Sequence, residues 1–159
     1  MRTVLMVQVD PGTTARLRAA VGARAAFEEA ADPDAALALL DRNDGAVVLA
    51  VLGATLDEPV RLAQQIGVRS RRTAVMLLTE ARRCDQLTRA IQFSPFLNST
   101  VTCQTTDDPD YLAHAFREVL DRADLQHRYG QMVQAAQARL QETPAAQRTS
   151  MLYLDRLLD

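Results

Sequence analysis

Residues 46–53, with the sequence AVVLAVLG, restrict the fold of this chain more than any other segment. Every residue before Gly53 in this run is apolar, and the turn-forming Asn43-Asp44-Gly45 precedes it. A short, partly β-branched apolar run between turn residues is typical of a strand buried on both faces. Such strands occur in parallel sheets covered by helices, so we expect an α/β protein. Chemistry in these sheets belongs at the carboxyl end of the strand, which we expect around Ala50.

Strand-like and helix-like segments alternate along the rest of the first 124 residues. The expected strands are residues 3–9, 23–30, 46–53, 74–78 and 96–103, and the expected helices are residues 12–21, 34–42, 55–66, 82–93 and 110–142. Asp-Pro pairs at Asp10, Asp32 and Asp108 each place a preferred N-cap residue before a proline at the first helical position. Residues 55–58, TLDE, match the capping box of a further helix start. Short connections predict right-handed crossovers and one parallel sheet.

Composition excludes several classes of function. The net charge of −2 offers no electrostatic reason to expect nucleic acid or an acidic membrane as a partner. All 18 basic residues are arginine, so no mechanism that needs a lysine can operate within this chain. No apolar run approaches the ~18 residues that a membrane helix needs, and no signal peptide precedes the first strand. We therefore expect a cytoplasmic protein that makes no membrane contact.

Four short segments, taken in order, resemble a known family. These segments are Asp10-Pro11 after the first strand, the apolar residues 46–53, residues 77–81 (LLTEA) and residues 108–112 (DPDYL). In order and spacing they are similar to the receiver domain of response regulators. The resemblance implies a flavodoxin-like (CheY-like), doubly wound, five-stranded parallel sheet in the order 2-1-3-4-5, followed by a long C-terminal helix. It implies a receiver-like domain at residues 1–124 and a helical extension, either a coiled coil or linker helices, at residues 125–159.

The departures from that family concern its phosphorylation site. Where the family has an acidic pair, this chain has Gln8 and Val9, and only the third acidic position, Asp10, is kept. Ala50 aligns with the phosphoacceptor aspartate, and no carboxylate lies between Asp44 and Asp57.

Two further positions of that site align with Thr79, which keeps the family's hydroxyl, and Thr105, which replaces its lysine. Thr79 aligns with the family's conserved threonine or serine, and its hydroxyl is retained. The family's lysine falls at Thr105, or at Val101 if the alignment slips. Phosphoryl transfer to a carboxylate needs the nucleophile, Mg²⁺ and a cation, so we expect no phosphorylation, no metal and no cofactor here.

The retained polar residues also have ordinary structural roles. Asp10 is expected to cap a helix rather than bind a metal, because Asp32 occupies the same Asp-Pro context. For Thr79 a local hydrogen bond is favoured over a surviving switch hydroxyl. Asp57 and Glu58 fit the first turn of a helix better than a contact with the degenerate pocket.

Cysteine, histidine and the arginine cluster give no clear site. Cys84 and Cys103 lack metal-like spacing and are expected to be reduced packing residues. His114 and His127 fall on the long helix without a second ligand pattern, which favours solvent or an interface. The turn at residues 69–72 carries three arginines that could contact a partner, although a solvated turn is the commoner case.

The long helix expected at residues 110–142 carries two apolar stripes. Its first half has residues to pack on the sheet: Leu112, Phe116, Val119, Leu120 and Ala123. Its second half has a stripe with the spacing of a helix–helix seam: Leu125, Tyr129, Met132, Val133, Ala136 and Leu140. This second stripe predicts a parallel or antiparallel homodimer, or packing against a second amphipathic helix at residues 145–159. Because that last pattern has no C-cap, we expect the chain to lead into a downstream domain.

Three functions compete at this stage. The first is a non-phosphorylatable receiver-like signalling module that dimerises or binds a partner signalling protein and transmits through its long helix. The second is a receiver-like domain that senses a small ligand at the degenerate pocket. The third is a small flavodoxin-like enzyme, against which no Gly-rich phosphate loop, acid–base pair or Cys–His pair is found in the sequence. We therefore expect no enzymatic activity. No helix-turn-helix pattern follows the domain, so a DNA-binding output is not expected.

Overall fold

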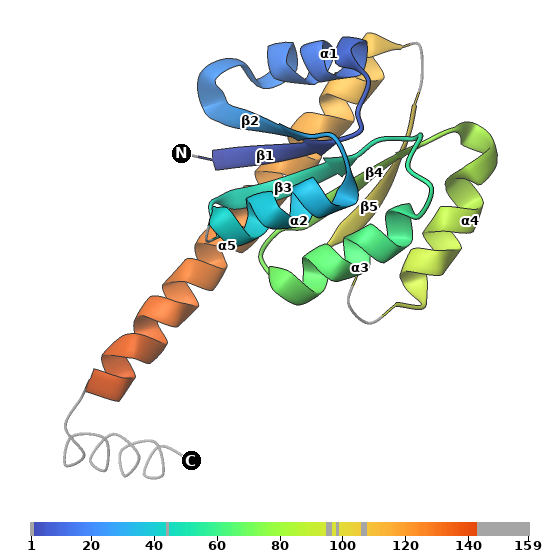
Figure 1. Ribbon diagram of the computed structural model, residues 1–159. Coiled ribbons are helices and arrows are strands. Elements are labelled where there is room, and N and C mark those ends of the chain that lie inside the picture. The colour runs from blue at the N-terminus through green and yellow to red at the C-terminus, as the bar shows by residue number, and fades with distance from the viewer. Residues whose placement is uncertain (1, 44, 95–96, 98, 106–107, 143–159) are drawn as a thin grey trace, which may run out of the picture. The chain divides into compact units, whose positions relative to one another are not determined.

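A computed structural model of the chain describes residues 2–43, 45–94, 97, 99–105 and 108–142. It contains one parallel sheet of five strands in the order β2-β1-β3-β4-β5 (Figure 1). The strands are β1 Arg2–Val7, β2 Ala25–Ala30, β3 Val47–Leu52, β4 Ala74–Thr79 and β5 Thr100–Gln104. The helices are α1 Pro11–Val21, the 3-10 turn η1 Gly22–Arg24, α2 Pro33–Arg42, α3 Pro59–Arg69, α4 Ala81–Gln92 and α5 Pro109–Glu142. The predicted doubly wound sheet, its strand order and the long C-terminal helix are confirmed.

Strand β3 lies at the centre of the sheet, as its apolar sequence predicts. It pairs with β1 on one side and β4 on the other, and all of its residues are buried. A β-bulge shifts the register between Thr3 and Val4, so that Val48 and Leu49 pack into the same cluster on one face of the sheet. The strand ends at Leu52, within the predicted range 46–53, and Ala50 lies two residues before that end.

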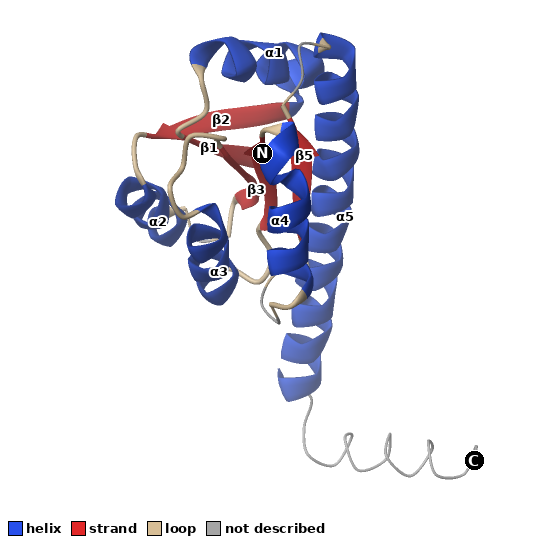
Figure 2. Cartoon of the chain, turned by 90° about the vertical axis from the view of Figure 1, so that its right-hand side faces the viewer, coloured by secondary structure: helices blue, strands red, loops and turns tan. Residues whose placement is uncertain are grey.

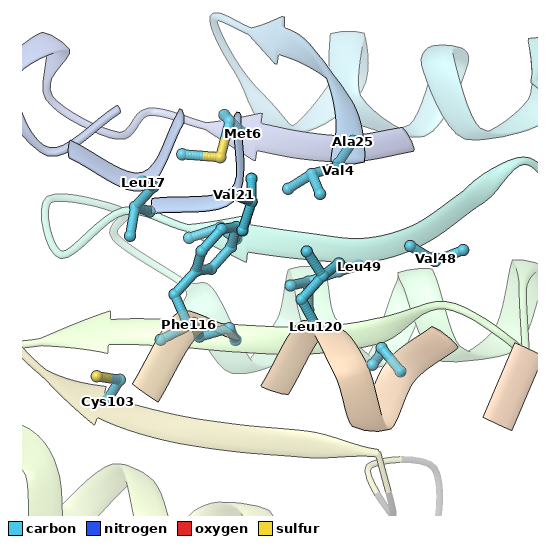
Figure 3. Packing of buried hydrophobic residues seen from close by; sticks show 14 of the residues in the cluster. Val4, Met6, Leu17, Val21, Ala25, Val48, Leu49, Cys103, Phe116 and Leu120 are labelled. Atoms are coloured by element: carbon cyan, nitrogen blue, oxygen red, sulfur yellow. The ribbon is translucent and has the colours of Figure 1, made fainter. Parts of the chain in front are cut away.

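Helices cover both faces of the sheet (Figure 1). On one face the core joins residues of β1, β3, β4 and β5 to apolar residues of α1 and of the first part of α5. Figure 3 shows the contributions of α1, β3 and α5 to this cluster: Leu17, Val21, Leu49, Phe116 and Leu120. On the other face α2 and α3 supply the buried side chains, and Ile91 of α4 packs at the margin. The first apolar stripe of α5 therefore packs on the sheet, as predicted.

Asp-Pro pairs begin three of the helices by the expected mechanism. Asp10 Oδ1 accepts a hydrogen bond of 2.8 Å from the Thr13 amide, and Asp32 Oδ1 accepts one of 2.8 Å from the Ala35 amide. Asp108 likewise accepts hydrogen bonds from the first turn of α5. Each carboxylate satisfies amide groups that have no partner inside the helix.

The capping box predicted at residues 55–58 does not form. Helix α3 begins at Pro59, and Glu58 occupies the N-cap position without a side-chain capping bond. The physical reason is Pro59, because a proline disfavours helical geometry at the preceding residue. Residues between Gly53 and Glu58 instead make a turn, closed by the Leu56 amide on the Gly53 carbonyl at 3.3 Å, which buries Leu56.

Strands β2 and β5 are both shorter than the sequence predicts. Strand β2 starts at Ala25 because residues 22–24 form a 3-10 turn. Strand β5 starts at Thr100, and residues 95–96 and 98 lie outside the described part of the chain.

The chain divides into two compact units, the first ending at His127 and the second beginning at Arg128. Helix α5 contributes to both units. The predicted division at residue 124 stays a prediction. Residues 143–159, with the helix predicted at 145–159, lie outside the described residues. Among the described helices, none combines the length and the apolar character needed to cross a bilayer.

Candidate functional site

Ala50, the position aligned with the phosphoacceptor, lies inside the sheet rather than at its edge. It pairs with Leu5 of β1 and Val75 of β4, and it is fully buried. Its methyl group belongs to the core cluster that α2 and α3 cover. A group at this position therefore contacts apolar side chains and has no access to solvent.

The carboxyl edge of the sheet is closed where β1 and β3 end. The Gly53 amide donates a hydrogen bond of 2.8 Å to the Val7 carbonyl. A Cβ atom at Gly53 would overlap the Gln8 carbonyl oxygen and lie 2.6 Å from its carbonyl carbon. Gln8 itself has a φ of 49°, which is uncommon for a residue with a side chain. The backbone at Gly53 thus contacts the backbone of Val7 and Gln8, at the edge where the resemblance places the acidic pair.

Val9 and Asp10 point away from a shared site. Val9 is a partly buried residue packed against the α1–α5 side of the core. Asp10 caps α1, and hydrogen bonds from the Thr13 side chain and backbone lower the pKa of its carboxyl group below the ordinary value. The Asp10 carboxylate is exposed and already engaged with α1.

Thr79 and Thr105 are brought together at the ends of β4 and β5. Thr105 donates to the Thr79 carbonyl from its amide at 2.7 Å and from its hydroxyl at 3.1 Å. The Thr79 hydroxyl donates locally, to the Glu80 carbonyl at 3.3 Å, as predicted. Thr79 lies four residues beyond Val75, the neighbour of Ala50, which corresponds to ~13 Å along a strand. One phosphoryl group cannot bridge that separation.

A cavity of about 360 Å³ lies beside this edge, at the starts of α2 and α3. Its lining includes Gln8 at the end of β1 and the acidic residues Asp34, Asp57 and Glu58. Asp57 and Glu58 thus approach the degenerate edge, which was the less favoured prediction, and Glu58 also pairs with Arg61 at 2.9 Å. Sequence reasoning missed Asp34 as a lining residue, although its place one residue after an Asp-Pro cap was a usable signal.

No metal centre is formed in the described part of the chain, where no three His, Cys, Asp or Glu side chains gather closely enough to hold an ion. Both cysteines are free thiols. Burial, and secondarily the nearby Cys84, raises the pKa of the Cys103 thiol, which suits a packing residue rather than a nucleophile.

The two histidines differ in environment. His114 is exposed, whereas His127 is buried at the end of the first unit. Burial and the nearby Arg72 lower the pKa of His127 below its ordinary value, and Asp124 acts in the opposite direction. In the arginine-rich turn, Arg69 lies 3.6 Å from Asp41 of α2.

The second apolar stripe of α5 is exposed, as its sequence pattern requires. The exposed fractions of Leu125, Tyr129 and Met132 are 67%, 71% and 70%. Val133 is 38% exposed and Ala136 is also exposed, while the side chain of Leu140 lies outside the described part. Surface of this kind is where an α-helix contacts another helix.

Comparison with known proteins identifies the fold. No family model matches the sequence, and no curated protein matches it. Solved structures do match. A response regulator receiver domain protein from Clostridium thermocellum superposes with a TM-score of 0.60 at 12% identity, covering 79% of this chain and 98% of that one. A CheY-like receiver domain protein from Methanospirillum hungatei gives 0.60 at 14% identity, with the same coverage.

A third neighbour extends further along the chain. The structure of an adenylate cyclase from Rhodopirellula baltica superposes with a TM-score of 0.61 at 14% identity, covering 89% of this chain and 98% of that one. With the sheet order and the helix arrangement, these likenesses define the class: the chain has the CheY-like receiver fold. At 12–14% identity they establish the fold alone.

Proposed function

We propose that this protein is a non-phosphorylatable, receiver-like signalling module without enzymatic activity, which acts through protein–protein contacts or dimerisation. The single observation that carries the proposal is Ala50, buried in the core at the aligned phosphoacceptor position. Solved neighbours described as receiver domains support this signalling role, among them those of Clostridium thermocellum, Methanospirillum hungatei and the hybrid histidine kinase CckA. The response regulator LqsR of Legionella pneumophila also supports it.

Loss of phosphorylation follows from the missing chemistry. The nucleophilic carboxylate is absent, Asp10 alone is a poor Mg²⁺ site, and no lysine exists in the chain. Incubation with acetyl phosphate and Mg²⁺, followed by intact mass spectrometry, should show the unmodified mass only. An adduct of one phosphoryl group that survives on this chain would contradict the proposal.

Dimerisation is supported by the exposed stripe on α5. Leu125, Tyr129 and Met132 expose apolar surface along one helix, and such surface is stabilised by a partner helix. Light scattering should report a dimer for the full chain. A chain cut after Arg128 loses Tyr129 and Met132 and should dimerise more weakly at the same concentration. Monomers in both cases would overturn this part of the proposal.

A ligand-sensing function is the second candidate, and the cavity beside Gln8 is the observation that favours it. Its volume of about 360 Å³ lies within the range of small-molecule pockets. A thermal-shift screen with nucleotides and quinones separates the two functions. A saturable rise in unfolding temperature that Arg61→Ala abolishes would favour the sensing role over the interaction role.

A further inference from the structure

Within the first unit, helix α5 carries a second set of five residues, of which four are exposed and one, Ala115, is half-buried against the core. These residues are spaced four and three apart along the helix: Tyr111, Ala115, Glu118, Arg122 and Leu125. Tyr111 is 51% exposed and Leu125 is 67% exposed. The alternating spacing continues directly into Tyr129 and Met132, so one seam of 4-3 periodicity runs along the outer side of α5.

A groove of about 380 Å³ accompanies this seam, between α5 and the beginning of β5. Figure 2 shows α5 beside β5, which is an edge strand of the sheet. Its lining combines small side chains, among them Ala74, Ala115 and Ala123, with the longer Glu118, Arg122 and Gln126. It therefore has room beside Ala115 for a larger apolar side chain from outside.

Two opposite charges occupy the middle of the seam. Glu118 and Arg122 are both exposed, and neither forms an ion pair with another residue in the described part of the chain. In a parallel pair of helices Glu118 would face Glu118 and Arg122 would face Arg122. Like charges directly opposed across an interface destabilise it.

An antiparallel pair reverses that outcome. Glu118 and Arg122 are equally distant from Leu120, so an antiparallel crossing centred at Leu120 places each glutamate opposite an arginine of the other copy. The same symmetry places Leu125 opposite Ala115, where the groove lies. In each half of this two-fold interface, a leucine then packs against an alanine, and a glutamate lies opposite an arginine.

We propose that α5 pairs with α5 of a second copy in antiparallel orientation, through Ala115, Glu118, Arg122 and Leu125. This inference rests on the dimer of the proposed function and adds its orientation and its contacts. Leu125 of each copy packs over Ala115 of the other, Tyr129 lies opposite Tyr111, and two Glu118–Arg122 pairs close the centre.

Charge exchange in the full chain tests the central pairs. Glu118→Arg and Arg122→Glu should each raise the dimer dissociation constant by at least about tenfold, because each creates like-charge contacts. The double variant Glu118→Arg/Arg122→Glu should restore the dissociation constant to within about threefold of the unmodified chain. Single variants as tight as the unmodified chain would overturn the antiparallel arrangement. Circular dichroism spectra check that each variant is folded.

Cross-linking tests the orientation independently. A mixture of the full-length Ala115→Cys and Leu125→Cys chains should form a disulfide-linked dimer under mild oxidation, whereas the Ala115→Cys chain alone should not. The unmodified chain, with Cys84 and Cys103, is the control. Cross-linking of Ala115→Cys with itself would show a parallel dimer and overturn this inference while the proposed function stands. A monomeric full chain would overturn this inference together with the dimerisation part of the proposed function.

Discussion

At the scale of the residue, Gly53 shapes the carboxyl edge of β3 more than Ala50 does. Ala50 has no nucleophilic group, which the sequence alone reveals. Gly53 closes the edge itself, because its missing side chain lets the chain after β3 touch the Gln8 carbonyl. A carboxylate introduced at position 50 would be a buried charge in an apolar core, because Ala50 is fully buried there.

Gly53→Ala should destabilise the first unit strongly. The added methyl group would overlap backbone atoms of Gln8, which cannot rotate away as a side chain could. We expect the free energy of unfolding to fall by about 1–3 kcal/mol or more, measured by urea denaturation. Gly12→Ala is the matched control, since its Cβ meets only the Asp10 side chain, at 3.3 Å, and it should change stability little. Equal effects of the two substitutions would contradict the closure of this edge.

His127 should make stability depend on pH. Burial and Arg72 lower the pKa of its imidazole in the folded chain below the ordinary 6.5, so the folded state resists protonation more than the unfolded state does. Its contribution is complete above pH 6.5 and is lost as the pH falls below that value towards the lower folded pKa. The thermal midpoint should drop between pH 7 and pH 5, and His127→Gln should flatten that drop. His114→Gln, which replaces the exposed histidine of the same helix, is the matched control.

At the scale of the element, the helix starts show which local signals are decisive. Asp10, Asp32 and Asp108 all cap as their Asp-Pro context predicts. Thr55 does not, because Pro59 delays the start of α3. An N-cap motif thus predicts a helix start only where the residues that follow it can adopt helical backbone geometry.

Asp32→Ala should cost about 1 kcal/mol, the usual loss for an N-cap side chain. The Asp32 carboxylate receives the Ala35 amide at 2.8 Å, and alanine leaves that amide to water. Glu58→Ala is the matched control, because Glu58 also precedes a proline at the first helical position but makes no capping bond. The Glu58 side chain pairs with Arg61 at the surface, so a smaller loss is expected. Chemical denaturation of both variants compares the two effects.

At the scale of the whole molecule, the first unit should fold without the rest of the chain. Its buried core lies within residues 3–127, and helix α5 contributes to that core up to Ala123. The chain cut after Arg128 should keep its far-UV circular dichroism per residue and a cooperative thermal transition. A non-cooperative transition of the cut chain would show that residues after Arg128 are required for the fold. The mass measurements proposed above then report assembly alone.

The sequence by itself determined the class of sheet, the central position of residues 46–53, the two stripes of the long helix and the absence of a carboxylate at the position aligned with the phosphoacceptor. These features follow from the local pattern of apolar residues and from the amino-acid composition, and both can be read without a three-dimensional structure. Only the tertiary structure showed that β3 ends at Leu52, that Gly53 closes the edge against Gln8, and that Thr105 bonds Thr79. Register and contacts between distant segments depend on packing across the sheet, and no local pattern encodes them.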